Sequence, residues 1–318
     1  MKRFLRHSTG MFVQEAKTLP QYTLFDLLHG YIYARWPYLY IGIATGEHRL
    51  ARFVLPVLAF LTKLPGGDHG RTSRRYTWNG NGRTKSAFAE GYHGKVVPLH
   101  NATRLVTVNR EVTVSAPEHV IPYAAARDIV LRNPDHIAAL QCPCRASRKN
   151  PCTPLDVCLI VGEPFAGFIL EHHPERARRI TPAEAVEILR AEDARGHVHH
   201  AFFKDAMLGR FYAICNCCSC CCGAMQAHRN GTPMLASSGY VASVDPALCV
   251  GCGTCGKYCQ FHAVSVVDGM KTIDEAECMG CGVCLPKCPR GAISLGRDPS
   301  RGVPLELDAL MLEAAEKN

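Results

Sequence analysis

A duplicated cysteine run near the C-terminus decides the fold of this chain. Residues 249–266 read CVGCGTCGKYCQFHAVSV, and residues 278–295 read CMGCGVCLPKCPRGAISL. Each run has the spacing C-x2-C-x2-C-x3-C, and each continues into a short apolar stretch that is typical of a β-strand. Because the similarity extends beyond the cysteines, we interpret the two runs as one unit repeated within the chain.

This spacing is the one that a [4Fe–4S] cluster requires. Three thiolates come from one tight loop, in which glycines let the backbone approach the cluster closely. The fourth cysteine of each run lies out of reach of its own cluster and ligates the other one. We therefore assign the first cluster to Cys249, Cys252, Cys255 and Cys288, and the second to Cys278, Cys281, Cys284 and Cys259. Structural zinc is the alternative for C-x2-C pairs, but the duplicated triple spacing favours iron–sulfur clusters.

The C-terminal segment resembles the bacterial two-cluster ferredoxins over about residues 241–297. The resemblance rests on the two runs and on the Cys288-Pro289 pair that closes the second one. It implies a ferredoxin-like module with short hairpins and two [4Fe–4S] clusters. The first run departs from the pattern because Cys259 is followed by Gln260 in place of proline, which leaves the number of ligands unchanged.

Ten further cysteines lie upstream, in two segments without the ferredoxin spacing. Residues 141–159 read QCPCRASRKNPCTPLDVCL, and residues 214–223 read ICNCCSCCCG. The candidate ligands are Cys142, Cys144, Cys152, Cys158, Cys215, Cys217, Cys218, Cys220, Cys221 and Cys222. We expect the two segments to meet in space, because so dense a group of thiols binds metal or oxidises.

If the second of these segments were extended, its cysteines would divide between two faces, because neighbouring side chains of a strand point to opposite sides. This predicts one face with Cys215, Cys217 and Cys221 and another with Cys218, Cys220 and Cys222. Ten thiols suffice for two four-cysteine clusters with two thiols left over, so one or two additional iron–sulfur clusters are expected. A single larger cluster and a redox-active dithiol are the alternatives.

Polar residues near the upstream cysteines are candidates for tuning such a site. Arg145 beside two thiolates would lower their pKa, or else would form an ordinary surface ion pair. His197, His199 and His200, in the segment GHVHH, are candidates for cluster ligands or proton carriers; the alternative is that they are solvated at a helix end. We expect no role for the pair His172 and His173.

The cysteine arrangement over about residues 120–297 also resembles a group of anaerobe-type 4Fe–4S ferredoxin proteins that carry an additional cysteine-rich domain. The motifs that carry this resemblance are C-x-C-R, D-x-C-L, G-H-V-H and I-C-N-C-C-x-C-C-C, followed by the two-cluster module. The resemblance implies that the upstream block and the module work as one unit.

The N-terminal third is basic and partly apolar. Residues 1–110 hold 16 Lys and Arg against 5 Asp and Glu, whereas the net charge of the whole chain is +8. Residues 20–65 are rich in Tyr and Trp, and their uncharged runs at 36–46 and 53–62 are too short to span a bilayer. They suit a peripheral membrane contact, a dock for a membrane or partner subunit, or a buried helical hairpin.

We expect an α+β protein with five segments. These are an aromatic-rich helical docking segment (1–65), a basic flexible linker (66–94), a cysteine-rich α+β domain (95–240), the two-cluster module (241–297) and a C-terminal helix (298–318). Short strands are predicted at 95–100, 104–108 and 111–115, and helices at 122–132 and 183–196.

Electron transfer is the leading functional hypothesis. The protein would relay single electrons through its two clusters to a redox partner protein, since we find no nucleotide, haem-attachment or radical-enzyme motif. A reductive enzyme with a catalytic cluster in the upstream domain is the first alternative, and a metal-handling or redox-sensing protein is the second. Whether the chain is itself an enzyme stays open.

The start of the chain, MKRFLRHSTG, has no apolar region of a secretory signal. We therefore expect a cytoplasmic protein, or one held peripherally at a membrane. Nucleic-acid binding is not indicated, because the basic residues at 66–94 form no recognised motif.

Overall fold

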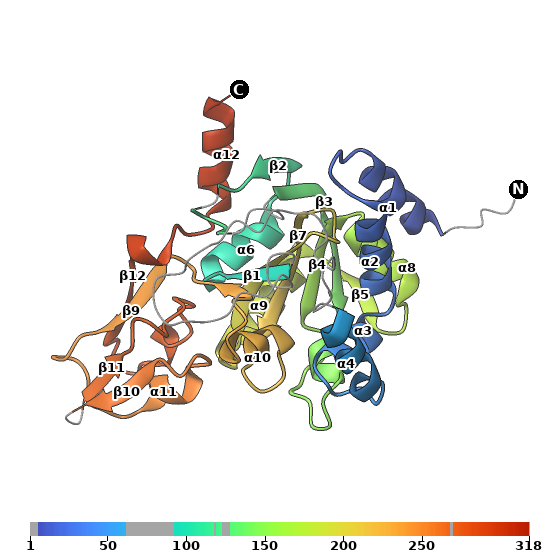
Figure 1. Ribbon diagram of the computed structural model, residues 1–318. Coiled ribbons are helices and arrows are strands. Elements are labelled where there is room, and N and C mark those ends of the chain that lie inside the picture. The colour runs from blue at the N-terminus through green and yellow to red at the C-terminus, as the bar shows by residue number, and fades with distance from the viewer. Residues whose placement is uncertain (1–5, 62–91, 118, 123–127, 268–269, 318) are drawn as a thin grey trace, which may run out of the picture.

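In the computed structural model, residues 6–61, 92–117, 119–122, 128–267 and 270–317 are described. An eight-stranded sheet forms the centre, in the order β2-β3-β4-β7-β6-β1-β8, with β5 paired to β3 (Figure 1). Its strands are β1 (Tyr92–Val96), β2 (Val112–Ser115), β3 (Asp128–Leu140), β4 (Cys158–Glu163), β5 (Ala177–Ile180), β6 (Val198–Lys204), β7 (Arg210–Cys217) and β8 (Leu235–Ala236). This mixture of helices and sheet confirms the expected α+β class.

Helices cover both faces of the sheet. One layer, with its own apolar core, consists of α1 (His7–Lys17), α2 (Leu24–Arg35), α8 (Phe165–His172) and α10 (Gly223–Arg229). The other layer consists of α6 (Leu99–Thr107), α9 (Pro182–Ala194) and α12 (Leu307–Glu316). A further helix, α3 (Pro37–Ala44), adjoins α2 and also contacts α4 (Ala51–Leu61) and α7 (Pro143–Ala146).

Strand alternation assigns each residue of the sheet to one of these two cores. On β4, Cys158 and Ile160 face the core beneath α8, which we call the α8 face, whereas Leu159 faces the core beneath α9. On β7, Ala213 belongs to the α8 face. Every second residue after Ala213 follows it, so the alternation directs the side chains of positions 215 and 217 toward Cys158.

Two local predictions were wrong. Residues 104–107 belong to helix α6, in which Asn101, Ala102, Leu105 and Val106 are buried at helical spacing. The helix predicted at 122–132 falls partly on residues 123–127, outside the described residues, and its remainder is strand β3. β3 accommodates Asn133 at φ 51° and the following proline, because its register with β4 shifts between Arg132 and Ile137.

Other local predictions were confirmed. Strand β2 covers the stretch expected at 111–115, and α9 begins where the Thr181 side chain accepts a hydrogen bond from the Glu184 amide at 3.2 Å. Helix α12 lies in the predicted C-terminal segment. The strand expected at 95–100 was only partly right, because β1 ends at Val96 and helix α6 begins at Leu99. Most of the linker predicted at 66–94 lies outside the described residues.

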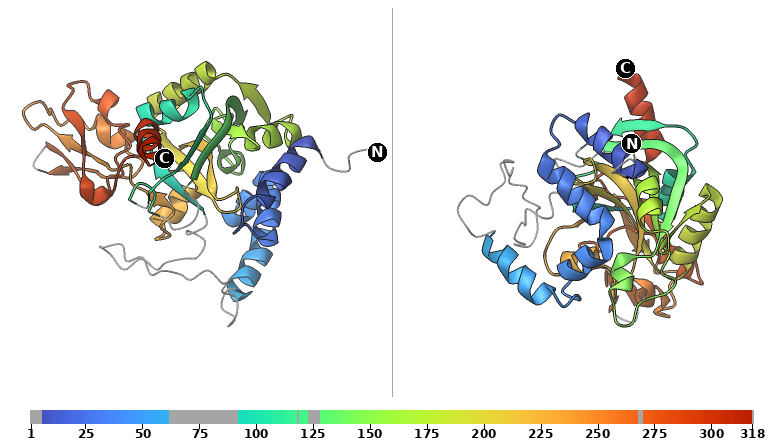
Figure 2. Two further views of the ribbon diagram at one scale, coloured as in Figure 1. Left: turned by 90° about the horizontal axis from the view of Figure 1, so that it is seen from above. Right: turned by 90° about the vertical axis from the view of Figure 1, so that its right-hand side faces the viewer.

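The C-terminal cysteine runs form a small unit beside the sheet, on the side away from α1–α4 (Figures 1 and 2). It contains two antiparallel strand pairs, β9 (Tyr240–Val244) with β12 (Ile293–Arg297) and β10 (Val264–Val267) with β11 (Met270–Ile273). Short helices α11 (Thr254–Tyr258) and η1 (Leu285–Lys287) lie at the two cysteine loops, and η2 (Pro299–Arg301) follows β12. We call this unit, residues 240–301, the dicluster module.

The N-terminal helices α1–α4 combine a buried and an exposed apolar side. Phe12 and Tyr33 are buried in the core of the α8 face, whereas α2 exposes Leu24 and Phe25. Among the described residues, no helix is both long and apolar enough to cross a bilayer.

Candidate metal centres

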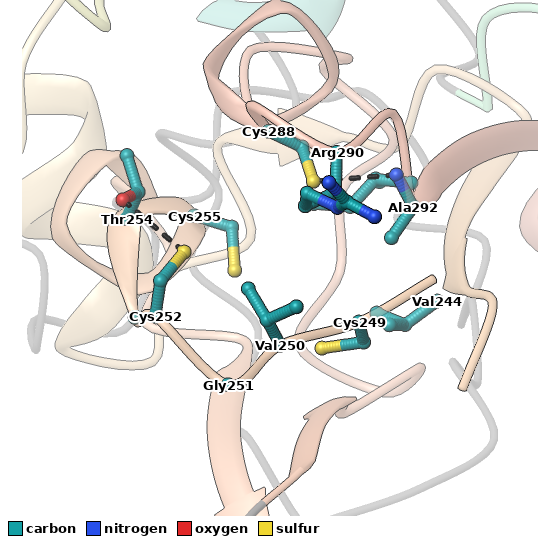
Figure 3. Close-up of a pocket in the computed structure, with 12 residues that line it drawn as sticks. Val244, Cys249, Val250, Gly251, Cys252, Thr254, Cys255, Cys288, Arg290 and Ala292 are labelled. Atoms are coloured by element: carbon teal, nitrogen blue, oxygen red, sulfur yellow. Dashed lines mark hydrogen bonds between the residues drawn. The ribbon is translucent and has the colours of Figure 1, made fainter. Parts of the chain in front are cut away.

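The first set of module cysteines surrounds one small cavity of about 20 Å³ (Figure 3). Three of its thiols come from the loop that leads into α11, and Cys288 reaches the same cavity from the second run. Gly251 and Gly253 line the cavity at φ 66° and 79°, backbone conformations that residues other than glycine rarely adopt. A cavity lined by four thiols on such loops fits a [4Fe–4S] cluster, which thiolates hold.

The second set of module cysteines lies close together as well. Burial, followed by the charges of Cys278 and Cys259, raises the pKa of the Cys284 thiol to about 12. Cys259, which belongs to the first cysteine run, thus lies near the cysteines of the second run. Gly280 has φ 64°, and a Cβ there would lie 2.0 Å from the Tyr240 carbonyl oxygen, so only glycine fits this loop.

The second set also adjoins the large domain. Met279 and Val283, its neighbours in the chain, are buried in the core of the α8 face, and Cys281 packs against that core. A separate small core within the module contains Cys255 and Cys288 of the first set together with Cys278, Cys284 and Cys259 of the second, so only the second set touches both cores. The second set therefore lies between the first set and the upstream cysteines.

Gln260 joins the module to the upstream cysteine segment. Its side-chain oxygen accepts a hydrogen bond from the Ser219 amide at 2.8 Å, and its Nε2 donates to the Gly196 carbonyl oxygen at 2.9 Å. Gln260 occupies the position where the ferredoxin pattern has proline. The departure from that pattern thus has a structural role, because proline has no side-chain amide for either hydrogen bond.

The ten upstream cysteines divide into a group of four and a group of six. The group of four, which we call the tetrathiol cluster, joins the loop after α7 to the turn after β7 and consists of Cys152, Cys218, Cys220 and Cys221. All four sulfur atoms lie within 4.8 Å of one another. The Cys152 Sγ lies 3.2 Å from the Cys220 Sγ and 3.8 Å from the Cys218 Sγ.

The remaining six thiols, which we call the six-thiol ring, line one cavity on the α8 face. Contacts between the thiols run in the order Cys215, Cys158, Cys142, Cys144, Cys222 and Cys217. The charge of Cys215 also acts on Cys217, which closes the ring along β7. The structure therefore brings both upstream segments together, as expected.

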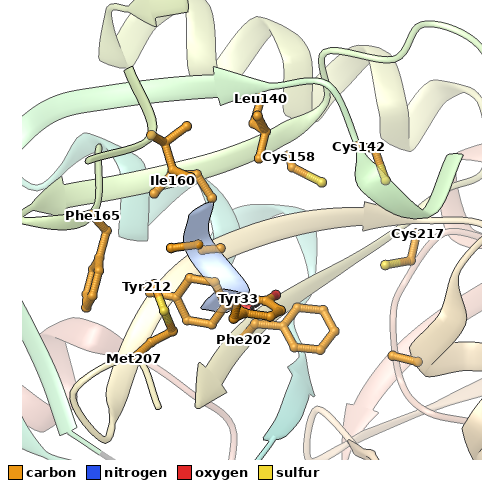
Figure 4. Packing of buried hydrophobic residues seen from close by; sticks show 14 of the residues in the cluster. Tyr33, Leu140, Cys142, Cys158, Ile160, Phe165, Phe202, Met207, Tyr212 and Cys217 are labelled. Atoms are coloured by element: carbon orange, nitrogen blue, oxygen red, sulfur yellow. Dashed lines mark hydrogen bonds between the residues drawn. The ribbon is translucent and has the colours of Figure 1, made fainter. Parts of the chain in front are cut away.

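The cavity extends beyond the ring and has a volume of about 150 Å³. Figure 4 shows Cys142, Cys158 and Cys217 toward one end of the surrounding core, with Tyr212 and Met207 toward the other. The Tyr33 and Tyr212 hydroxyls lie 2.8 Å apart, within hydrogen-bond distance. The cavity thus combines thiols with an aromatic, largely apolar wall.

Neighbouring thiols and burial affect the protonation of the ring cysteines. The neighbouring thiol Cys144 first, and then burial, raise the pKa of Cys142 to about 12, although contact with Cys158 opposes the shift. Without a bound cation the Cys142 thiol therefore stays protonated, because a neighbouring thiolate would disfavour its ionisation. A metal centre would supply the positive charge that ionises it.

The chain turns at residues 219–221, and this turn changes the predicted sorting of cysteines. The Cys222 amide donates to the Cys218 carbonyl oxygen at 3.1 Å, so the strand alternation ends at Cys217. Cys222 consequently joins the ring and Cys221 joins the tetrathiol cluster, the reverse of the prediction for an extended segment. The other four positions lie as the alternation predicts.

Arg145 forms a buried network, not a surface ion pair. Its side chain is 1% exposed, and its Nη2 donates to Glu192 Oε2 at 2.5 Å and to the Asn216 carbonyl oxygen at 3.0 Å. His197 Nδ1 lies 2.6 Å from the same Glu192 oxygen. Arg145 and His197 thus support the walls of the cysteine site through Glu192, and His197 is buried instead of solvated.

The other histidines of the GHVHH segment lie on both faces of β6. His199 contacts the Asn216 side chain at 2.6 Å on the face away from the ring, so the structure does not place it among the thiols. His200 pairs in register with Cys215, and its ring lies 6.5 Å from Phe261 of the module. Of the candidate histidines on β6, His200 is therefore the one that alternation places on the α8 face, together with Val198 and Phe202.

His172 and His173 are not an idle loop pair. His172 Nε2 lies 2.9 Å from the Thr9 hydroxyl, and His173 Nε2 lies 2.8 Å from the Ala34 carbonyl oxygen. They attach helices α1 and α2 to the end of α8.

Comparison with known proteins identifies one region of the chain. Residues 248–293 match the family described as the 4Fe-4S dicluster domain. No curated protein matches the chain. The matched residues contain both cysteine runs, so the chain carries an iron–sulfur dicluster domain, and its many cysteines support a role in electron transfer.

Proposed function

We propose that this protein is an electron-transfer subunit in which the dicluster module exchanges electrons with a further iron–sulfur centre held by the six-thiol ring. When bound, iron–sulfur clusters supply one-electron chemistry. The observation that carries the proposal is the position of the second module site. Its neighbours Met279 and Val283 share a core with Cys142, Cys158 and Cys217 of the ring.

We infer the order in which electrons pass the sites from how exposed the residues around each site are. The loop of the first set exposes Leu248 and Val250, whose side chains are 42% and 63% exposed. An external redox partner would therefore dock at this loop, and the second set would connect it to the ring. Gln260 holds the two parts in register through its hydrogen bonds to Ser219 and Gly196.

Iron and acid-labile sulfide, measured per chain on anaerobically purified protein, test the metal content. The module accounts for about eight iron atoms. A Cys142→Ser/Cys158→Ser double variant should lose the iron above eight, while the reduced module keeps its EPR signals. Unchanged iron in that variant, or no iron above eight in the natural protein, would refute a centre in the ring.

The connection has a separate test. Gln260→Leu should slow the reduction of the ring centre in stopped-flow experiments without changing the metal content. Gln14→Leu is a matched control, because Gln14 is exposed on α1. Equal rates in both variants would show that electrons do not cross at Gln260.

A reductive enzyme is the second candidate, and the aromatic part of the ring cavity favours it. Tyr33, Phe202 and Tyr212 line space that the thiols leave on one side. A small apolar molecule fits such a wall. Under this alternative, an added small ligand would alter the EPR signal of the ring centre, and Tyr212→Trp would abolish that effect by filling the cavity.

We also propose that α2 contacts an anionic membrane surface. Leu24, Phe25 and Leu28 form an exposed stripe, with side chains 81%, 60% and 55% exposed. Arg35 lies over the Trp36 ring at 5.5 Å. Apolar and aromatic side chains next to arginine are typical of helices that lie in a membrane interface.

A further inference from the structure

We propose that the tetrathiol cluster binds a single Zn²⁺ ion, separate from any iron–sulfur cluster. Four thiolates around one zinc ion at about 2.3 Å would have sulfur–sulfur separations of about 3.8 Å. The Cys218–Cys152 and Cys220–Cys221 separations are 3.8 and 3.7 Å, the Cys152–Cys220 separation is 3.2 Å, and all four sulfur atoms lie within 4.8 Å of one another. The four thiols thus have the spacing of a one-ion site.

The same structure provides an internal comparison. A [4Fe–4S] cluster places four iron atoms between its thiolates, and so holds them farther apart than one ion does. Within the described part of the chain, neither module set nor the six-thiol ring contains three thiols within 4.8 Å of one another. The tetrathiol cluster therefore differs in size from the sites that suit iron–sulfur clusters.

The surroundings favour a closed, structural site. Four cysteines complete a tetrahedral zinc site, so no coordination position remains for a substrate. Zinc would displace four thiol protons to solvent, and the site would then carry a net charge of −2. Arg148 donates to the Cys221 carbonyl oxygen at 2.9 Å, and Arg229 donates to the Ser219 carbonyl oxygen at 2.7 Å. Arg229 and Arg148, which also pairs with Glu47, thus place positive charge beside the site.

The position of the site indicates what the ion does. Cys152 and Cys218 are 66 residues apart, and a metal link between them closes a long loop. Cys217 and Cys222, which flank the turn, point into the ring, and Ser219 within the turn contacts Gln260. Zinc would therefore link the loop that holds Cys152 to the turn after β7, next to the contact with Gln260.

Metal analysis of the full chain, purified without oxygen, tests this assignment. We expect one zinc per chain in addition to iron, and loss of that zinc in Cys220→Ser with iron and sulfide unchanged. Cys220 is the exposed member of the cluster, so its replacement leaves no buried cavity. Cys252→Ser is the matched control, because this exposed module cysteine should lose iron and keep zinc.

Cobalt provides a second measurement that does not depend on purified zinc content. Co²⁺ exchanged into the natural protein should give the visible bands of a tetrahedral tetrathiolate, and Cys220→Ser should lose them. Joint loss of iron and sulfide in Cys220→Ser would overturn the proposal, as would the absence of zinc from the natural protein. These outcomes are independent of whether the ring holds an iron–sulfur centre, which the Cys142→Ser/Cys158→Ser variant tests.

Discussion

Replacement of Gly280 by alanine is expected to disrupt the second module site while leaving the first intact. A Cβ at this position would lie 2.0 Å from the Tyr240 carbonyl oxygen and 2.3 Å from the Ser238 hydroxyl. Cβ contacts below 3.0 Å essentially do not occur, so the loop would have to move by about 1 Å. Such overpacking costs about 1–3 kcal/mol. The left-handed backbone at φ 64° adds about 1–2 kcal/mol.

Gly282 is the matched control in the same loop. It has φ 79°, and a Cβ there would meet only the Leu295 side chain, at 3.6 Å. Gly282→Ala therefore carries the backbone cost of about 1–2 kcal/mol without the overlap. We expect Gly280→Ala to lose about four iron atoms per chain and Gly282→Ala to retain them. EPR would show which site remains.

Iron and sulfide analysis of the two variants, purified side by side, decides the outcome. Equal iron content in both would refute the claim that close approach to Tyr240 requires glycine. If Gly280→Ala lost all of its iron, the two module sites would not be separable as the structure indicates.

Three further perturbations follow from buried charge and exposed apolar surface. Glu192→Ala leaves Arg145 buried without its carboxylate and should destabilise the protein by about 3–5 kcal/mol, as measured by thermal unfolding. The double variant Arg145→Met/Glu192→Leu removes both charges and should recover most of that loss. Failure to recover would show that the network acts through more than its charge pair. Burial lowers the pKa of Lys95 to about 7, below its unfolded value, so the unfolded chain binds more protons between pH 7 and about 10. The free energy of unfolding of the natural protein should therefore rise with pH over that range relative to Lys95→Met, and parallel pH profiles would contradict the assignment. Phe25→Glu should weaken cosedimentation with anionic vesicles, whereas Glu47→Gln should not; equal binding of both variants would argue against the α2 contact.

The dicluster module could be predicted from the sequence because its ligands are local. Three thiolates at fixed spacing, separated by glycines, define a loop by themselves, and only one contact per cluster is distant. The structure brings Cys288 to the first site and Cys259 to the second, as the spacing predicts. Gln260 could be recognised as a departure from the pattern. Its partners Ser219 and Gly196 lie outside the dicluster module, so the sequence around residue 260 does not indicate them.

The upstream fold was harder to predict because neighbouring elements override local pattern. The stretch 128–132 continues as strand β3, since its pairing with β2 and β4 outweighs its helical pattern. The alternation of β6 was readable in GHVHH, yet the direction of the α8 face depends on which core covers each side. That information comes from helices distant in the sequence, such as α8 and α9, and no spacing within residues 197–200 contains it.

One tight turn decides how the six cysteines at 215–222 are divided. Strand alternation on β7 directs Cys215 and Cys217 into the ring, and the turn that the Cys222–Cys218 hydrogen bond closes returns Cys222 to the same side. The residues inside the turn point outward, where Cys152 meets them. A chain extended through this segment would place Cys221 in the ring and separate the four sulfur atoms of the tetrathiol cluster. The turn therefore determines the membership of both groups of thiols, because it directs Cys217 and Cys222 into the ring and Cys218, Cys220 and Cys221 toward Cys152.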